Sequence, residues 1–201
     1  MRPEMKKILP LLSTIIFLYF LSGCVAGQKI PYAYNPTVVE VPALNTSVES
    51  TVVDVRPFIV NNNKHPSYIG HFRGGFGNTW QVNTRGKLPL ADVFQQDLQK
   101  ELLALGAQTG THPGKIVRVE IVDYNFDAYL NGRFWYKFKI AVYDEAKRLL
   151  AEDTIQNEHV IKGSFWVGPV FAFKREIPIL HAQIVRELVR DNEKILNALR
   201  N

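Results

Sequence analysis

The chain has 201 residues, a formal net charge of +5 and a single cysteine, Cys24. A basic excess this small is not the electrostatic footprint of a nucleic-acid-binding protein. One cysteine excludes a disulfide within the chain and a zinc site built from several thiolates. The length suits one domain with a sizeable core after a leader segment is removed.

Residues 1–23 have the composition of a secretory signal peptide. Three basic residues precede the apolar stretch 8–21, and Ser22-Gly23 follows it. This order of a basic start, an apolar stretch and small residues predicts export and cleavage. The apolar stretch is shorter than the ~20 residues that a membrane-spanning helix needs, although an uncleaved anchor is the alternative. The leader holds three basic residues and one acidic residue, so the mature chain has a net charge of about +3.

Leu21-Ser22-Gly23-Cys24 resembles the lipobox of bacterial lipoprotein precursors. This resemblance implies cleavage before Cys24 and a thioether-linked diacylglycerol on its sulfur. Two or more acyl chains hold a protein stably on a bilayer, so membrane lipid is the first predicted partner. Val25 follows the cysteine, where an aspartate would favour the inner membrane. By resemblance to the Gram-negative sorting rule, Val25 predicts the outer membrane, with the domain on its periplasmic face.

Residues 24–47 predict a lipidated tether, because prolines and glycines interrupt any regular pattern. The domain is then expected over residues 48–201. Its first strand is predicted at 51–55, a run rich in β-branched residues that ends at Arg56-Pro57. The glycine-rich stretch 60–87 is expected to be a long irregular loop, which inside a compact domain is functional or mobile.

A helix is predicted over residues 89–105. Pro89 suits a first helical position, Asp92 lies in the first turn, and Gly106 suits the C-cap. Apolar residues recur at three- and four-residue steps and define one face. They are Val93, Phe94, Leu98, Leu102 and Leu105.

Three alternating segments, 115–126, 133–143 and 149–161, predict an antiparallel meander with one covered and one wetter face. Asn131-Gly132 indicates a two-residue hairpin turn between the first two. A change of phase near Val122 and Asp123 predicts a β-bulge. A second glycine- and aromatic-rich segment, 163–175, precedes a helix over 178–199. The fold class is therefore α+β: a two-layer domain in which two helices pack on one face of an antiparallel sheet.

Metal and phosphate chemistry find little support in the sequence. The five histidines show no pair at a metal-binding spacing, and no Gly-Lys-Ser/Thr follows the glycine-rich loop. The sequence therefore predicts no cofactor and no metal.

Acidic residues offer only weak candidates for glycan cleavage. The pairs considered come from Asp123, Asp127 and Asp144, or from Glu152 with Asp153. Solvated carboxylates on strand faces and turns are the favoured interpretation, and the chain is not expected to be an enzyme.

Half-exposed aromatic residues are the best lead to a partner-binding site. Trp135 is predicted to share a strand face with Lys137 and Lys139, while Trp80 and Trp166 are placed in loops. Aromatic residues beside basic ones suit contact with a protein or glycan. The alternative is that these rings cover the second face of the sheet or plug the loops.

Three strings, Val52-Val53-Asp54-Val55-Arg56, residues 98–106 and residues 117–121, together with the lipobox, resemble the YajG-like lipoproteins of Gram-negative bacteria. The resemblance spans most of residues 49–200, with the stretch 60–87 as an addition. It implies an outer-membrane α+β lipoprotein without established catalytic residues.

The function predicted is that of a lipid-anchored, non-catalytic lipoprotein that binds an envelope protein or peptidoglycan. One alternative is an accessory lipoprotein subunit of an envelope transport or secretion complex. The other is a glycan-acting enzyme.

Overall fold

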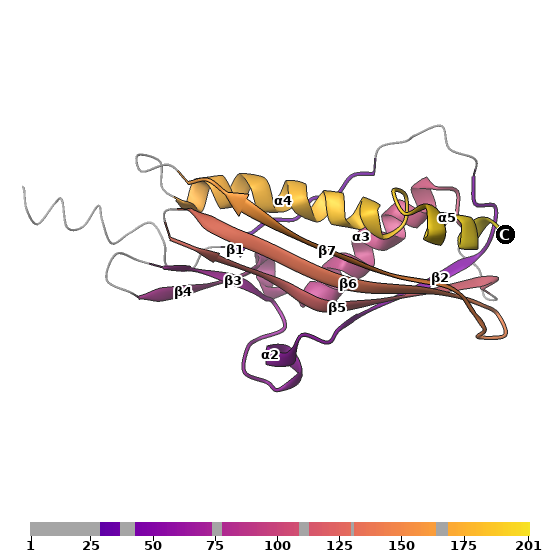
Figure 1. Cartoon of the computed structure of the whole chain (residues 1–201), viewed down its shortest axis with the longest axis horizontal. Coiled ribbons are helices and arrows are strands. Elements are labelled where there is room, and N and C mark those ends of the chain that lie inside the picture. The colour runs from indigo at the N-terminus through magenta and orange to yellow at the C-terminus, as the bar shows by residue number, and fades with distance from the viewer. Residues whose placement is uncertain (1–28, 37–42, 74–77, 109–112, 130, 164–168) are drawn as a thin grey trace, which may run out of the picture.

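A computed structural model describes residues 29–36, 43–73, 78–108, 113–129, 131–163 and 169–201. The domain has two layers, a seven-stranded sheet and a helical layer on one of its faces (Figure 1). This confirms the predicted α+β fold class. The strands are β1 (Lys29–Ile30), β2 (Val48–Asp54), β3 (Tyr68–Arg73), β4 (Thr79–Thr84), β5 (Lys115–Ala128), β6 (Gly132–Asp144) and β7 (Leu149–Ile161). The helices are α2 (Pro57–Val60), η1 (Arg85–Lys87), α3 (Leu90–Ala104), α4 (Pro169–Leu188) and α5 (Glu193–Arg200).

The strand order is β1-β4-β3-β5-β6-β7, and β2 also pairs with β5. The predicted meander β5-β6-β7 is antiparallel. The sheet as a whole is mixed, because β2 and β3 both run parallel to β5, and β1 runs parallel to β4. Helix α3 lies between β2 and β5 in the chain, and a helical crossover of this kind joins parallel strands.

The stretch 60–87 is not one long loop, which corrects the sequence prediction. It contains β3 and β4, an antiparallel pair in which Phe72 lies opposite Trp80. Gly70 interrupts the strand pattern of β3 in the sequence. Its φ is +154°, and a Cβ there would lie 2.4 Å from the Phe126 ring, so close packing rather than a turn requires this glycine.

The folded domain begins earlier than residue 48, so the predicted tether is too long. Strand β1 pairs with β4, and Ile30, Tyr34 and Leu44 are buried. The Tyr34 hydroxyl donates a hydrogen bond to the Glu101 carboxylate of α3. Residues 29–36 therefore form a strap that packs against the helices.

The C-terminal helix is also different from the prediction. Helix α4 begins at Pro169 and carries Pro178 inside it, and a separate helix α5 follows. Asn192 caps α5, since its side-chain oxygen accepts a hydrogen bond from the Ile195 amide at 3.2 Å. Pro178 suggested a helix start, but buried Phe173 and Ile177 extend the apolar face of α4 towards the N-terminus.

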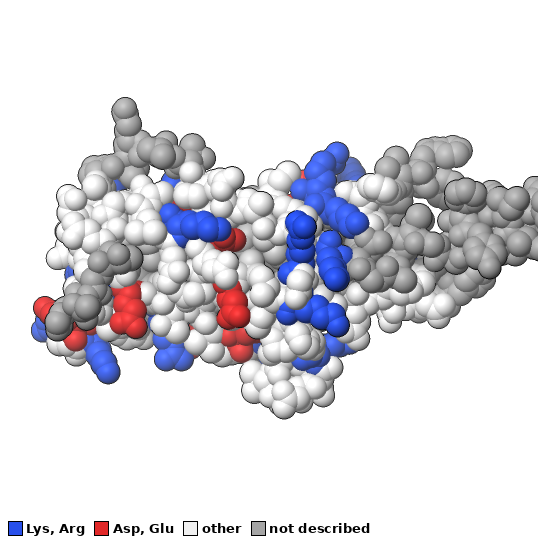
Figure 2. Space-filling model, turned by 180° about the vertical axis from the view of Figure 1, so that it is seen from behind, with Lys and Arg blue, Asp and Glu red and all other residues white. Residues whose placement is uncertain are grey.

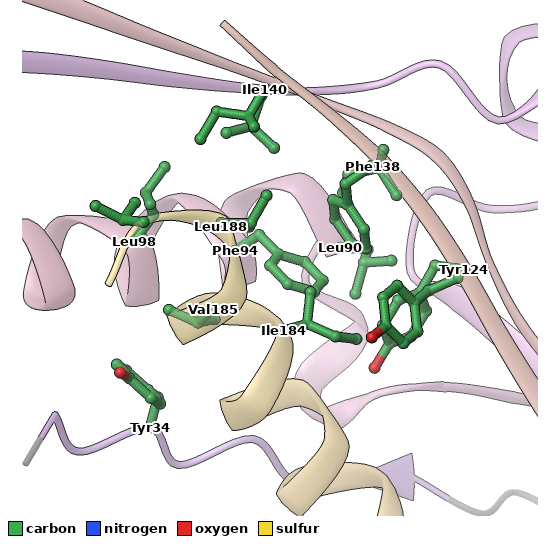
Figure 3. Packing of buried hydrophobic residues seen from close by; sticks show 14 of the residues in the cluster. Tyr34, Leu90, Phe94, Leu98, Tyr124, Phe138, Ile140, Ile184, Val185 and Leu188 are labelled. Atoms are coloured by element: carbon green, nitrogen blue, oxygen red, sulfur yellow. The ribbon is translucent and has the colours of Figure 1, made fainter. Parts of the chain in front are cut away.

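The core lies between the meander and the helices α3 and α4 (Figure 3). The Phe94 ring of α3 meets Tyr124 of β5 at 5.6 Å and Phe138 of β6 at 4.8 Å between ring centroids. It also meets His181 of α4 at 4.3 Å. One aromatic side chain thus joins both layers, and such contacts add stability beyond the buried area itself.

Candidate binding face of the sheet

Trp135 lies on the face of the sheet opposite the helices, as the alternation predicts. Its strand neighbours Phe134 and Tyr136 are 0% and 3% exposed and face the core, whereas Trp135 is half-buried. The register places Trp135 between Asn125 of β5 and Glu158 of β7. Lys137 and Lys139 follow on the same face, farther along β6.

The predicted bulge determines which side chains of β5 lie on the same face of the sheet as Trp135. The register shifts between Ile121 and Asp123. Because side chains alternate along a strand, one extra residue exchanges the two faces beyond it. Tyr124 and Phe126 therefore enter the core, and Asp123 and Asp127 move to the open face.

Asp123 holds the indole of Trp135 in place. The Trp135 Nε1–H donates to Asp123 Oδ2 over 2.9 Å. Burial raises the pKa of Asp123, although the hydrogen bond from Trp135 opposes this. A tryptophan fixed in this way presents its ring with little loss of side-chain entropy on binding.

A hollow, here called the Trp135 hollow, lies at one end of this face. Its apolar part is Trp135 with Tyr129 and Val160, which are 49% and 64% exposed. Its lining consists of Arg73, Asp127, Tyr129, Asn131, Gly132, Arg133, Trp135, Glu158 and Val160. An aromatic centre with a charged rim is the composition of an energetically important protein contact.

The rim of the Trp135 hollow carries charges of both signs. Arg73 Nε lies 2.7 Å from Asp127 Oδ1, and its second nitrogen also contacts that carboxylate. The hydrogen bond from Arg73 lowers the pKa of Asp127. His71 Nε2 is 3.3 Å from Asp127, and Arg133 Nε is 3.5 Å from Glu158. The rim therefore has little net field to attract a purely anionic polymer.

The remaining aromatic candidates do not join this hollow. Trp80 is in β4 rather than in a loop, opposite Phe72, whose ring packs against Phe173 of α4 at 5.7 Å. Trp80 therefore lies on the helix-covered side of the sheet. Lys139 lines a second hollow on the open face, with Arg118 and Glu120. Trp166 and Cys24 lie outside the described residues.

Among the predicted candidates for glycan cleavage, the three aspartates on β5 and β6 lie far apart. Asp123 and Asp127 are four residues apart on β5, about 13 Å along a strand. Asp144 lies opposite Lys115, at the other end of the same pair of strands. Paired-carboxylate mechanisms need separations of roughly 5–9.5 Å. Glu152 and Asp153 are adjacent in β7 and so face opposite sides, and Asp153 accepts a hydrogen bond from Asn192.

Two buried polar clusters were not predicted from the sequence. The first cluster is centred on Arg56, which is fully buried. The second cluster lies on the helical side, where His181 Nε2 is 2.9 Å from Asp97 Oδ2 and Arg190 Nε is 2.5 Å from Glu101 Oε1. The position of Asp97 and Glu101 within the apolar repeat of α3 was the available signal. Among the described residues, no group of three or more His, Cys, Asp or Glu side chains is placed to hold a metal ion.

No family model matches the chain, and no match is found among curated proteins. Solved structures of related shape include a Xanthomonas campestris protein described by the family model DUF330, with 10% identity over 81% of this chain and 92% of that chain, at a TM-score of 0.49. A hypothetical protein of Chlamydia trachomatis, CT253, has 12% identity over 71% and 93%, at 0.38. The lipoprotein GNA1162 of Neisseria meningitidis has 10% identity over 70% and 99%, at 0.30.

Within the part of the chain that the structure describes, no helix is both long and apolar enough to cross a bilayer.

Proposed function

We propose that this chain is a lipid-anchored, non-catalytic lipoprotein of the bacterial envelope, and that its domain binds a protein partner through the Trp135 hollow. The hollow is the observation that carries the proposal. Trp135 is held by Asp123, lies beside exposed Tyr129 and Val160, and is surrounded by two arginines, Arg73 and Arg133. Tryptophan, tyrosine and arginine are the residues most enriched among strong interface contacts.

A protein partner suits the hollow better than a cell-wall polymer does. The rim charges are matched within the domain, since Arg73 pairs with Asp127 and Arg133 with Glu158. An anionic polymer would gain little from such a rim. A protein surface offers apolar side chains for the aromatic centre and both charges for the rim. A glycan partner is the alternative outcome of the test below.

The anchor is supported by the sequence. A signal segment ends in Leu21-Ser22-Gly23-Cys24, and Val25 at the next position favours the outer membrane. The closer likeness to YajG-like lipoproteins rests on the short strings around Val52–Arg56 and in α3 and β5. The outer-membrane anchor and the likeness to YajG-like lipoproteins are both parts of the proposal.

Site-specific crosslinking in living cells tests the binding face. A photoreactive amino acid at Glu158 is expected to capture one defined partner. The same amino acid at Leu103, an exposed position of α3 on the helical side, is the matched control. A partner that belongs to an inner-membrane complex would indicate an accessory subunit of a transport machine instead of a free-standing lipoprotein.

Binding measurements with the purified partner then test whether the captured protein contacts the Trp135 hollow directly. Trp135→Ala removes the centre of the hollow and is expected to weaken binding by about 30-fold, the size of a typical hot-spot loss. Trp80→Ala removes an aromatic ring of the same type from the other side of the sheet and should leave affinity unchanged. Equal losses in the two variants, or capture of peptidoglycan alone, would contradict the proposed face.

Membrane fractionation tests the anchor independently. Wild type is expected in the outer-membrane fraction with acyl chains on Cys24, and Cys24→Ala is expected to lose them. A Cys24→Ala variant that is still lipidated and still in the outer membrane would refute the anchor.

A further inference from the structure

The lipidated cysteine and the folded domain are separated by very few residues. Strand β1 begins at Lys29, only five residues after Cys24. Five residues span at most about 18 Å even when fully extended. If Cys24 carries the anchor, the side of the domain where β1 lies must stay close to the membrane surface.

Basic side chains gather on this side. Lys29 pairs in register with Asn83, two residues before Arg85, and Lys87 follows in η1. Lys29, Arg85 and Lys87 are all exposed, and none has an ion-pair partner among the described residues. Figure 2 shows Lys and Arg side chains gathered in a column on one face of the molecule, with the acidic side chains mostly to one side of it.

An exposed apolar residue completes this surface. Leu88 directly follows Lys87 and is 47% exposed. The turn that carries it is held at its base, because the Thr84 hydroxyl donates to the Leu88 carbonyl and Thr84 itself is buried. Lys29, Arg85, Lys87 and Leu88 are called the anchor-side patch below. An apolar residue among basic ones is the composition that binds at a bilayer interface.

We infer that the anchor-side patch rests on anionic phospholipid headgroups of the membrane that holds the lipid anchor, and so orients the domain on it. This inference rests on the proposed anchor, because the short segment after Cys24 keeps the patch within reach of the headgroups. The patch carries three unmatched positive charges, which complement an anionic lipid surface. The first carboxylate after it in the chain is Asp92, in the first turn of α3.

Docking in this way has a consequence for the Trp135 hollow. The patch belongs to the β1 and β4 margin of the sheet, whereas the hollow is formed by the ends of β3, β5, β6 and β7. Fixing one margin against the bilayer restricts the directions from which a partner reaches the hollow. The anchor and the binding face then act together.

Energy transfer to labelled lipid tests the orientation. The mature lipoprotein is purified from membranes and reconstituted into vesicles with or without phosphatidylglycerol. A fluorophore is placed at Gln81→Cys, an exposed position of β4 four residues before Arg85, or at Leu103→Cys, an exposed position near the C-terminal end of α3. Neither residue belongs to the patch. Acylated Cys24 does not react with the label. Transfer to a headgroup-linked acceptor is expected to be stronger from position 81, and to rise when phosphatidylglycerol is present.

Charge variants test the cause. A basic residue at an anionic surface changes a docking equilibrium by about fivefold. The triple variant K29Q/R85Q/K87Q is therefore expected to lower docking on the order of 100-fold. The matched control K147Q/K194Q/R200Q has the same net charge and leaves the patch intact, so it should transfer like wild type. Equal transfer from positions 81 and 103, or equal behaviour of the two triple variants, would overturn the inference.

The vesicle assay also separates this inference from the anchor. Wild type that floats with neutral vesicles confirms the anchor, and the transfer data then judge the patch alone. Wild type that does not float with neutral vesicles refutes the anchor. In that case, recruitment by phosphatidylglycerol that K29Q/R85Q/K87Q abolishes would still support the patch, and absence of recruitment would refute it.

Discussion

The guanidinium of Arg56 donates a hydrogen bond of 2.9 Å to the carbonyl oxygen of Tyr124, at a point where β5 has no strand beside it on that edge. Strand β2 pairs with β5 as far as Ile121, and β3 pairs with it from Asp127. Arg56 fills the interval between these two partners. It also donates to the Tyr68 carbonyl and forms a bidentate pair with Asp54.

Arg56→Ala is expected to destabilise the domain by about 3–5 kcal/mol, because it leaves the Asp54 carboxylate and two carbonyl groups buried without their donor. Arg56→Lys should recover only part of the lost stability, since an ammonium cannot form the bidentate pair. Urea unfolding measures the change. Arg133→Ala is the control, because its side chain is 71% exposed, and an effect within ~0.5 kcal/mol is expected there. Equal effects at both arginines would contradict this role for Arg56.

The pair His181 and Asp97 predicts a loss of stability in mild acid. Burial lowers the pKa of His181 from its ordinary 6.5, against the opposing effect of Asp97. Burial raises the pKa of Asp97, but the hydrogen bonds from His181 and Lys100 have the larger combined effect. The pKa of Asp97 therefore lies below its ordinary value of 3.8. His181 Nδ1 is buried without a partner, so a proton placed there would have no acceptor.

The folded state therefore binds fewer protons than the unfolded state below pH 6.5, and stability must fall as the pH falls. The slope reaches at most about 1.4 kcal/mol per pH unit for one proton. Protonation of Asp97 removes further stability at still lower pH. Denaturant unfolding from neutral pH downwards measures the slope, and His181→Gln should flatten its upper part. If the slope is unchanged in His181→Gln, other titrating groups cause the loss of stability in acid.

Gly132 is required where β6 passes beneath α4. A Cβ at this position would lie 2.3 Å from Phe173 Cζ and 2.7 Å from the Ala128 Cβ. Gly132→Ala is expected to cost about 1–3 kcal/mol through overpacking. Combining it with Phe173→Leu should restore part of the loss in thermal unfolding. Gly86→Ala meets open space and bears only the strain of φ +73°, about 1 kcal/mol. No recovery in the double variant would indicate that Phe173 is not the cause.

The strap of residues 29–36 is expected to contribute to stability through Tyr34. Tyr34→Phe removes a hydrogen bond to the Glu101 carboxylate, and bonds to charged groups are worth about 1.5–3 kcal/mol. Tyr129→Phe alters an exposed hydroxyl and is expected to have no measurable effect. If Tyr34→Phe were as stable as wild type in chemical unfolding, the hydrogen bond from Tyr34 to Glu101 would not contribute to holding the strap.

Elements with a strong local repeat could be predicted from the sequence. Helix α3 and strands β5, β6 and β7 follow from apolar periodicity, and the bulge at Val122 follows from a change of phase in one strand. Local patterns report such features because neighbouring residues alone determine which face a side chain occupies. The same alternation along β6 places Trp135 on the open face.

Features that depend on distant partners could not be predicted. Strand β1 has only two residues and exists because β4 lies beside it, and β3 contains Gly70, which close packing against Phe126 requires. Trp80 and Trp135 looked equivalent in the sequence, but the register of β4 against β3 places Trp80 on the helix-covered side.

Three features follow from the amino-acid sequence alone: the lipobox-like motif at Cys24, the two-layer α+β class and the aromatic residues that suggest a binding face. Contacts between distant segments show that Arg56 fills a gap beside β5, that Asp123 holds Trp135, and that the folded domain begins at β1, five residues after Cys24. The physical reason is that a motif and a periodicity are properties of adjacent residues. Whether a charge is buried, which residue contacts a ring and where a tether ends depend on how segments distant in the chain pack together.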